Sequence, residues 1–168
     1  SPYLEKKQVE AFGVRFDEDA LAVPMRDADG KLWSLQTIKA DGSKRFLYNG
    51  KKKGCFHSIG EIGAQAIIAE GYSTSASIHM ATGLPVAVAF DAGNLEPVLE
   101  ALKARHPTLE IIIAGDDDCW KTPNTGRVKA EAAAKKYGCK LVFPTFKNAS
   151  TKPTDFNDLH CLEGLEMV

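Results

Sequence analysis

The chain has 168 residues, 44% of them apolar and 26% charged, which is typical of a globular protein with enough length for one core. The net charge of −1 excludes a polycationic surface, so nucleic acid would have to be bound by a local basic patch. No apolar run approaches the roughly 20 residues of a membrane-spanning helix, and no signal-peptide core opens the chain. Four separated cysteines without a CxxC pair favour free thiols. We expect a cytoplasmic protein with no membrane partner.

The first 60 residues are expected to form a small, basic, β-rich subdomain. Short apolar segments there are separated by Asp-Gly at 29–30 and 41–42 and by Asn-Gly at 49–50. Such pairs are typical of tight turns between antiparallel strands. The sequence therefore predicts a small antiparallel sheet before residue 60.

Positive charge gathers in the second half of this subdomain. Six basic residues fall within fifteen positions, namely Lys39, Lys44, Arg45, Lys51, Lys52 and Lys53. They could bind phosphates or form a solvated loop, and the sequence leaves both interpretations open. The aromatic residues Trp33, Phe46, Tyr48 and Phe56 lie among them. They could stack on bases, although packing in the small sheet is the commoner role for each one.

From residue 61 onward, apolar strands alternate with helices. The expected strands are 64–70, 84–90, 109–115 and 139–144, and the expected helices between them are 73–83, 94–106 and 126–138. This alternation calls for βαβ units and a parallel sheet with helices on both faces. The predicted fold class is therefore α/β, with a four-stranded, mainly parallel sheet over residues 61–168.

Acidic residues follow several of these strands. Glu70 closes the first strand, Asp116–Asp118 follow the third, and the segment TDFNDLH comes after the fourth. Each acid alone is more often a turn former or a helix N-cap. Carboxylates that converge at the carboxyl edge of a parallel sheet need a counter-charge, and hard cations prefer oxygen ligands. The predicted ligands of Mg²⁺ or Mn²⁺ are Glu70, Asp116, Asp118, Asp155 and Asp158.

The middle aspartate of the run is expected to differ from its neighbours. If residues 116–118 stay extended, their side chains alternate in direction, so Asp117 should point away from the metal. We therefore expect replacement of Asp117 by Asn to have a mild effect.

Taken together, AEGYSTSAS at 69–77, GDDD at 115–118, GRVKAEAAA at 126–134 and KPTDFNDLH at 152–160 resemble the TOPRIM domain of DnaG-type primases, topoisomerases and some nucleases. The leader VPMRDADGKLWSLQTI is similar to the segment that precedes this domain in plasmid conjugation and phage-type primases. The resemblance implies a TOPRIM fold, with Glu70, Asp116 and Asp118 as catalytic residues. Whether Glu70 acts as a metal ligand or as a general base stays open.

The resemblance also implies a function. The chain would be the catalytic core fragment of a DNA primase, a metal-dependent nucleotidyltransferase that makes short RNA primers from ribonucleoside triphosphates on a single-stranded DNA template. A helicase or other flanking domains of a larger polypeptide would be its partners, and the fragment alone would not have to be active. The residues expected to bind nucleic acid or nucleotide are Lys44, Arg45, Lys51, Lys52, Lys53 and Arg127.

Two alternatives use the same residues. A TOPRIM nuclease needs the same acids but uses water as the nucleophile, and a non-catalytic module would only bind metal or nucleic acid. The chain departs from the primase pattern at Asp117, where a small residue is common, and in the segment CWKTPNT before Gly126. It also carries no zinc-binding module. Primer synthesis on a homopolymer template would separate the three hypotheses.

Overall fold

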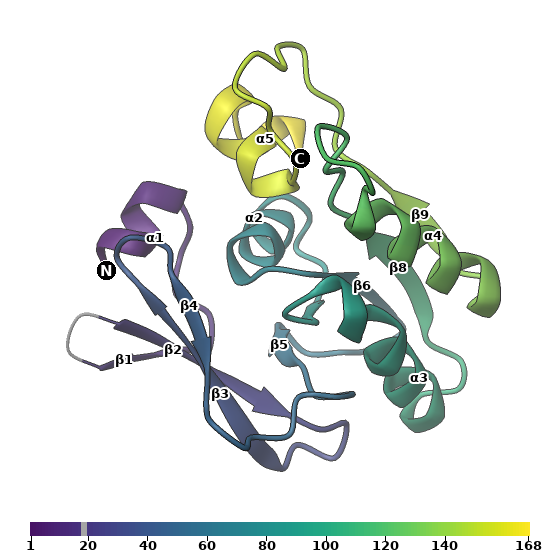
Figure 1. The fold of residues 1–168 in the computed structure, drawn as a ribbon. Coiled ribbons are helices and arrows are strands. Elements are labelled where there is room, and N and C mark those ends of the chain that lie inside the picture. Colours follow the sequence, from purple (N-terminus) through teal and green to yellow (C-terminus); the bar gives the residue numbers. More distant parts are fainter. Residues whose placement is uncertain (18–19) are drawn as a thin grey trace.

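The computed structural model describes residues 1–17 and 20–168, which form two sheets (Figure 1). The short helix α1 (Pro2–Lys7) precedes a four-stranded antiparallel sheet. Its strands, in spatial order, are β1 (Arg15–Asp17), β2 (Ala20–Arg26), β3 (Leu32–Lys39) and β4 (Lys44–Phe46). The two predicted Asp-Gly turns join β2 to β3 and β3 to β4, and Gly30 and Gly42 take the positive φ that such turns require. The predicted antiparallel leader is confirmed.

One face of this sheet is buried against the rest of the molecule. Leu21, Val23 and Met25 alternate with more exposed residues along β2, and Ile38 lies on the same face of β3. These side chains share a core with Tyr72 and other residues of the following sheet and its helix. The alternation arises because successive side chains of a strand point to opposite faces.

The second sheet has five strands in the order β5-β7-β6-β8-β9. The strands β6 (Gln65–Ala69), β7 (Val86–Val88), β8 (Glu110–Ala114) and β9 (Lys140–Val142) pair in parallel, as predicted. The additional strand β5 (His57–Ile59) pairs antiparallel with β7 at the edge. Residues 57–59, just before the predicted domain boundary, therefore belong to the second sheet. The domain boundary near residue 60 stays a prediction.

Helices cover both faces of the parallel sheet (Figure 1). The pair α2 (Tyr72–Thr82) and α5 (Phe156–Glu163) lies on one face, and the pair α3 (Leu95–Arg105) and α4 (Thr125–Tyr137) lies on the other. Short 3-10 turns occupy Ala92–Asn94 and Leu165–Met167. Because α2 also contacts the antiparallel sheet, the two sheets are joined through one continuous apolar core.

No helix in the described part of the chain is both long enough and apolar enough to cross a membrane. All four cysteines are free thiols in the structure, as predicted. The fold is held by the apolar cores and by hydrogen bonds rather than by cross-links.

Candidate active site

A cleft of about 420 Å³ lies at the carboxyl ends of the parallel strands. Glu70 follows β6 and Asp116 follows β8, and these two strands are direct neighbours in the sheet. Strand ends that meet at one edge bring their following residues together, which is the position where ligands bind in open α/β sheets. The parallel sheet and α5 contribute the acids Glu70, Asp91, Asp116 and Asp155 to the cleft lining. The N-terminal part of the chain contributes Lys6, Lys7 and Lys44 together with one acid, Asp41.

The two carboxylates at the centre of the cleft are buried without partners. One oxygen of each, Oε1 of Glu70 and Oδ1 of Asp116, is buried and receives no hydrogen bond. Gly126, in the first turn of α4, permits this packing, since a Cβ there would stand 3.0 Å from the carbonyl oxygen of Asp116 and 3.1 Å from Glu70 Oε1. A buried acceptor without a donor is costly unless something else occupies its lone pairs.

The pKa values of Glu70 and Asp116 are both raised, so their ionised forms are disfavoured unless a cation is present. Burial first, and then the negative charges of Asp118, Asp91 and Asp155, together raise the pKa of Glu70 to about 7. Burial and, after it, the charge of Glu70 are the largest causes that raise the pKa of Asp116 to about 9. Both shifts follow from desolvation and from like charges that disfavour the ionised form.

A lysine from the antiparallel sheet enters this acidic environment. Lys44 begins β4, and its Nζ lies 3.7 Å from the position that a Cβ of Gly71 would occupy. Burial lowers the pKa of Lys44, while Asp155, Asp116 and Glu70 act in the opposite direction. Lys44 thus lines the cleft, and its ammonium group partly balances the acids.

Both carboxylate oxygens of Asp117 accept hydrogen bonds, whereas Oδ1 of Asp116 accepts none. Its Oδ2 accepts a hydrogen bond from Nη1 of Arg127 at 2.7 Å, and its Oδ1 accepts one from Nδ2 of Asn124 at 2.6 Å. Arg127 also donates through Nε to Glu131 at 3.0 Å and lies 4.3 Å from the centre of the Phe143 ring. The guanidinium expected to bind phosphate thus has carboxylate partners within the protein.

Two of the five predicted metal ligands, Asp118 and Asp158, lie outside the cleft lining, whereas Asp155 belongs to it. Asp118 pairs with Lys121 at 3.3 Å, although its charge still raises the pKa of Glu70. Asp158 accepts a hydrogen bond from the backbone N–H of Thr154 at 2.9 Å. Asp155 caps α5 by accepting from the backbone N–H of Asp158 at 2.9 Å, and it also faces the cleft. The structure therefore places Asp155, and not Asp158, beside Glu70.

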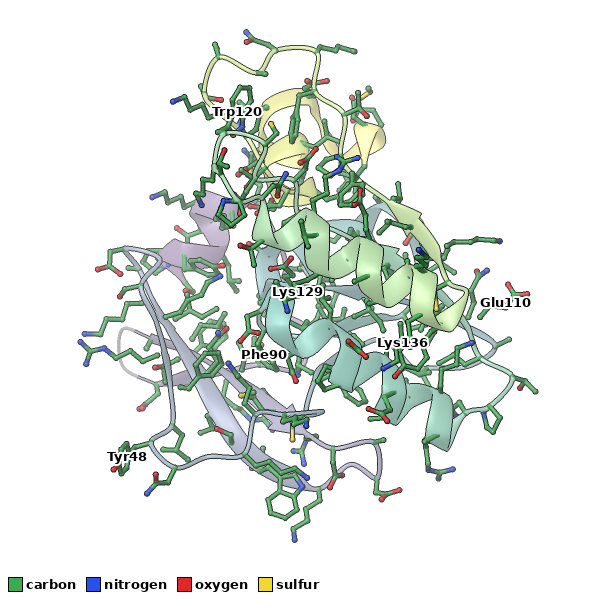
Figure 2. The ribbon with its side chains drawn as sticks, turned by 45° about the vertical axis from the view of Figure 1, so that its right-hand side comes forward. Tyr48, Phe90, Glu110, Trp120, Lys129 and Lys136 are labelled. Carbon is green, nitrogen blue, oxygen red and sulfur yellow. The ribbon has the colours of Figure 1, made fainter. Side chains whose placement is uncertain are left out.

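Two contacts hold the segment of Asp155 against the segment of Asp116. The backbone N–H of Asp117 donates to the carbonyl oxygen of Thr154 at 2.8 Å. The indole N–H of Trp120, labelled in Figure 2, donates to the carbonyl oxygen of Pro153 at 3.1 Å. The loop that departs from the primase pattern thus fixes one acidic segment relative to the other.

The basic residues of the leader divide into paired and unpaired groups. Lys52 Nζ lies 2.5 Å from Oδ2 of Asp91, and Lys51 Nζ lies 4.7 Å from the centre of the Trp33 ring. Among the described residues, Arg45 and Lys53 have no ion-pair partner. The predicted basic patch is on the surface, but its members do not have equivalent environments.

The aromatic residues divide in the same way. Phe56 is buried in the core, whereas Trp33, Phe46 and Tyr48 are exposed, and 88% of Tyr48 is accessible. Figure 2 shows Tyr48 at the outer margin of the molecule. Core packing therefore applies to Phe56, and base stacking stays a prediction for the exposed three.

Several residues of the cleft were missed by sequence reasoning. Asp91 follows β7, so the rule that led to Glu70 and Asp116 could have found it. Lys7 in α1 gave no such signal, because it is brought to the cleft by tertiary contacts. Asn157 makes those contacts: its Nδ2 donates to the carbonyl oxygen of Lys7 at 2.8 Å and to Oγ of Ser77 at 3.0 Å.

The donors present suit a divalent cation that completes its coordination with water and substrate. Within the described residues, no three His, Cys, Asp or Glu side chains form a preformed metal group. Mg²⁺ is commonly held by one or two carboxylates together with water and substrate phosphates. The unpartnered oxygens of Glu70 and Asp116 fit that manner of binding.

The fold matches those of solved primase cores. One is the primase fragment of the bacteriophage T7 primase-helicase protein, with a TM-score of 0.63 at 16% identity, covering 99% of this chain and 66% of that one. Another is the DnaG catalytic core, with a TM-score of 0.58 at 14% identity, covering 96% of this chain and 67% of that one. These similarities show a shared fold.

Sequence comparison identifies a relative with higher sequence identity than these structures. An Escherichia coli protein named DNA primase TraC is 45% identical over 168 residues, which is 92% of this chain and 12% of that protein. The chain thus spans about an eighth of the length of this relative. The sequence profile of the Toprim domain matches residues 65–166, the region that carries the parallel sheet and all the predicted acids. The chain therefore belongs to the Toprim domain family.

Proposed function

We propose that the chain is the catalytic core fragment of a DNA primase, a nucleotidyltransferase that joins ribonucleotides on a single-stranded DNA template. The observation that carries this proposal is the polarity of the cleft. Buried, unpartnered carboxylate oxygens of Glu70 and Asp116 lie on one side, and Lys7 and Lys44 lie on the other. A divalent cation with a nucleoside triphosphate carries the charges that complement both sides.

The acids are proposed to hold the metal. Glu70 and Asp116 would supply ligand oxygens to Mg²⁺ or Mn²⁺. Asp118 and Asp155, whose charges raise the pKa of both carboxyls, are the proposed further ligands. When bound, such an ion bridges phosphate oxygens and neutralises charge during phosphoryl transfer. The geometry favours Asp155 over Asp158, because Asp155 lines the cleft and Asp158 does not.

Glu70 has a second proposed role as a base. Its carboxyl is buried at the centre of the cleft, and its pKa is raised to about 7 by burial and by neighbouring acids. A base with a pKa near the working pH is well matched to accept the proton of a primer 3′-hydroxyl. Ligand and base are alternative assignments for the same residue.

The template is proposed to run over the antiparallel sheet. Arg45, Lys51 and Lys53 supply exposed positive charge there, and Trp33 and Tyr48 offer exposed rings for base stacking. Lys44 would contact nucleotide phosphates in the cleft. Lys52 and Arg127 are also predicted to bind nucleic acid or nucleotide. Each forms an ion pair within the protein, Lys52 with Asp91 and Arg127 with Asp117.

The partners of the larger polypeptide are part of the same proposal. The T7 relative by fold carries the name primase-helicase, which supports a helicase or other flanking domains as partners. Because this chain corresponds to 12% of its E. coli relative, other parts of such a protein would contribute to template selection or activity.

Primer synthesis tests the proposal directly. The chain is incubated with a homopolymer single-stranded DNA, the complementary ribonucleoside triphosphate and Mn²⁺ or Mg²⁺, and labelled products are resolved by length. We expect RNA products from the wild type and their loss in Glu70→Gln and Asp116→Asn. Glu100→Gln, an exposed glutamate on α3 outside the cleft, is the matched control and should retain synthesis.

The same samples separate the alternatives. Cleavage of labelled single-stranded DNA without nucleotides, lost in the same two variants, would indicate a nuclease instead. If neither activity occurs, Mn²⁺ titration by calorimetry decides whether the site is a binding module. Equal Mn²⁺ binding by the wild type and by an Asp116→Asn, Asp118→Asn double variant would contradict a metal site at these acids.

A further inference from the structure

An ion pair joins the basic loop between β4 and β5 (residues 47–56) to the carboxyl edge of the parallel sheet. Lys52 Nζ lies 2.5 Å from Oδ2 of Asp91, although the two residues are 39 positions apart. Asp91 lies three residues after the end of β7, and its other oxygen accepts from the backbone N–H of Asn94 at 3.0 Å. Its carboxylate is thus held from two sides, and Lys52 is the partner from the basic loop.

Two aromatic rings lie beneath this ion pair. Lys52 Nζ stands 4.9 Å from the centre of the Phe46 ring, and Phe46 contacts Phe90 edge to face at 6.2 Å between centroids. Figure 2 shows Phe90 between the antiparallel sheet and the helices of the parallel sheet. Two contacts, one between charges and one between aromatic rings, therefore join β4 and the basic loop to the segment after β7.

The backbone at Phe90 is strained. Phe90 is buried and has a φ of 74°, a conformation that bulky residues rarely adopt and that persists only where surrounding contacts impose it. Its N–H donates to the carbonyl oxygen of Glu70 at 2.7 Å. The sharp turn at Phe90 thus directs Asp91 toward Lys52 while the same residue is tied to the backbone of the central acid.

We propose that Lys52 and Asp91 form a latch, a positioning pair that fixes the basic loop against the catalytic edge and withholds Lys52 from nucleic acid. An ammonium group held by a carboxylate releases no counterion when DNA binds, because the carboxylate has already neutralised it. Lys52 therefore differs in role from Lys53, which is adjacent in sequence and has no ion-pair partner among the described residues. The inference deepens the proposed function and rests on it only for the DNA measurement.

A double-mutant cycle in urea tests the latch without any nucleic acid. Lys52→Met keeps the apolar stem over Phe46, and Asp91→Asn keeps the oxygen that caps Asn94. For a partly buried ion pair, we expect the two changes to be coupled by about fivefold in the unfolding equilibrium constant. The matched control cycle, Lys53→Met with Asp91→Asn, should be additive. Additive effects in the Lys52 cycle would overturn the latch, whether or not the protein binds DNA.

The salt dependence of single-stranded DNA binding tests the withheld charge. Each phosphate contact contributes about 0.7 to the slope of log affinity against log salt for single strands. Lys53→Met should reduce the slope by about that amount, and Lys52→Met should leave it unchanged. Asp91→Asn should steepen it by about 0.7, because Lys52 becomes free to contact phosphate, and the double variant should return to the wild-type slope. A lower slope in Lys52→Met would make Lys52 an ordinary phosphate contact and overturn the proposal.

Absence of DNA binding by the wild type would contradict the proposed function. The latch would then be decided by the double-mutant cycle in urea.

Discussion

Neutralising Glu70 should stabilise the metal-free protein at high pH. In the unfolded chain the carboxyl of Glu70 has a pKa near 4.5, whereas in the folded protein burial and neighbouring acids raise the pKa to about 7. Between these values the folded state binds more protons than the unfolded state, so the free energy of unfolding falls as the pH rises. Glu70→Gln removes this dependence, because Gln carries no ionisable proton.

The magnitude follows from the same two values. The difference between a pKa of 4.5 and a pKa of about 7, at about 1.4 kcal/mol per pH unit, corresponds to about 3 kcal/mol of stability lost above pH 7. Asp116, whose pKa is raised to about 9, acts in the same direction. Removing the Glu70 charge also relieves Asp116, since Glu70 is the second cause of that shift. We therefore expect Glu70→Gln to exceed the wild type in stability by on the order of 3 kcal/mol at pH 8.

Urea unfolding in the presence of EDTA, at pH 5 and at pH 8, measures this difference. Glu100→Gln is the control, since that glutamate is exposed on α3 and other titrating groups are common to all three proteins. Addition of Mn²⁺ at pH 8 should reverse the ranking, because a ligand at about 1,000 times its Kd stabilises the wild type by about 4.1 kcal/mol. The reasoning would be refuted if Glu70→Gln and Glu100→Gln showed the same pH dependence as the wild type.

Three further predictions concern the surroundings of the acids. Asp117→Asn, expected from side-chain alternation to be mild, should cost about 1 kcal/mol in urea unfolding, because the charged contact with Arg127 is lost. The Asp116→Asn, Asp118→Asn double variant should release no heat of binding when titrated with Mn²⁺, because charge and ligand oxygens are removed together. Asn157→Ala should lower stability by about 2 kcal/mol in thermal unfolding, and amide hydrogen exchange should accelerate in α1, because the carbonyl of Lys7 loses its donor.

The parallel sheet and its acidic edge could be predicted from the sequence because their signals are local. Each strand from β6 to β9 is apolar and is followed by a helix, and a right-handed crossover leaves little choice of topology. Glu70 and Asp116 could then be placed together, because both follow parallel strands that pair directly. The rule would also have placed Asp91 at this edge if it had been applied to β7.

The remaining features depend on contacts between distant segments. The strand β5 has three residues, which is too few for a periodic pattern, and only its pairing with β7 identifies it. Lys7 reaches the cleft through Asn157, which is 150 positions away. Lys52 appeared equivalent to its neighbours in a run of lysines, and its ion pair with Asp91 distinguishes it. Charge and spacing show that a basic loop exists, but tertiary structure decides which of its charges are free.

The close approach of α4 to the carboxylates gives the last prediction. Gly126 lies in the first turn of α4, and a methyl group there would meet the carbonyl oxygen of Asp116 at 3.0 Å and Glu70 Oε1 at 3.1 Å. Alanine is favoured over glycine in helix interiors by up to about 1 kcal/mol, so helix propensity alone would predict stabilisation. The carbonyl oxygen belongs to the backbone and cannot move aside by a rotamer change, so the start of α4 has to shift.

We therefore expect Gly126→Ala to destabilise the protein by about 1–3 kcal/mol in urea, the usual cost of overpacking, and to weaken Mn²⁺ binding in calorimetry. Gly63→Ala is the control, because no atom lies within 4 Å of its added methyl group. The loss of Mn²⁺ affinity separates a displaced carboxylate pair from a general loss of stability, since the titration is carried out where both variants are folded. A Gly126→Ala variant that is more stable than the wild type and binds Mn²⁺ equally well would show that α4 can retreat freely, and that its contact with Glu70 and Asp116 does not position them.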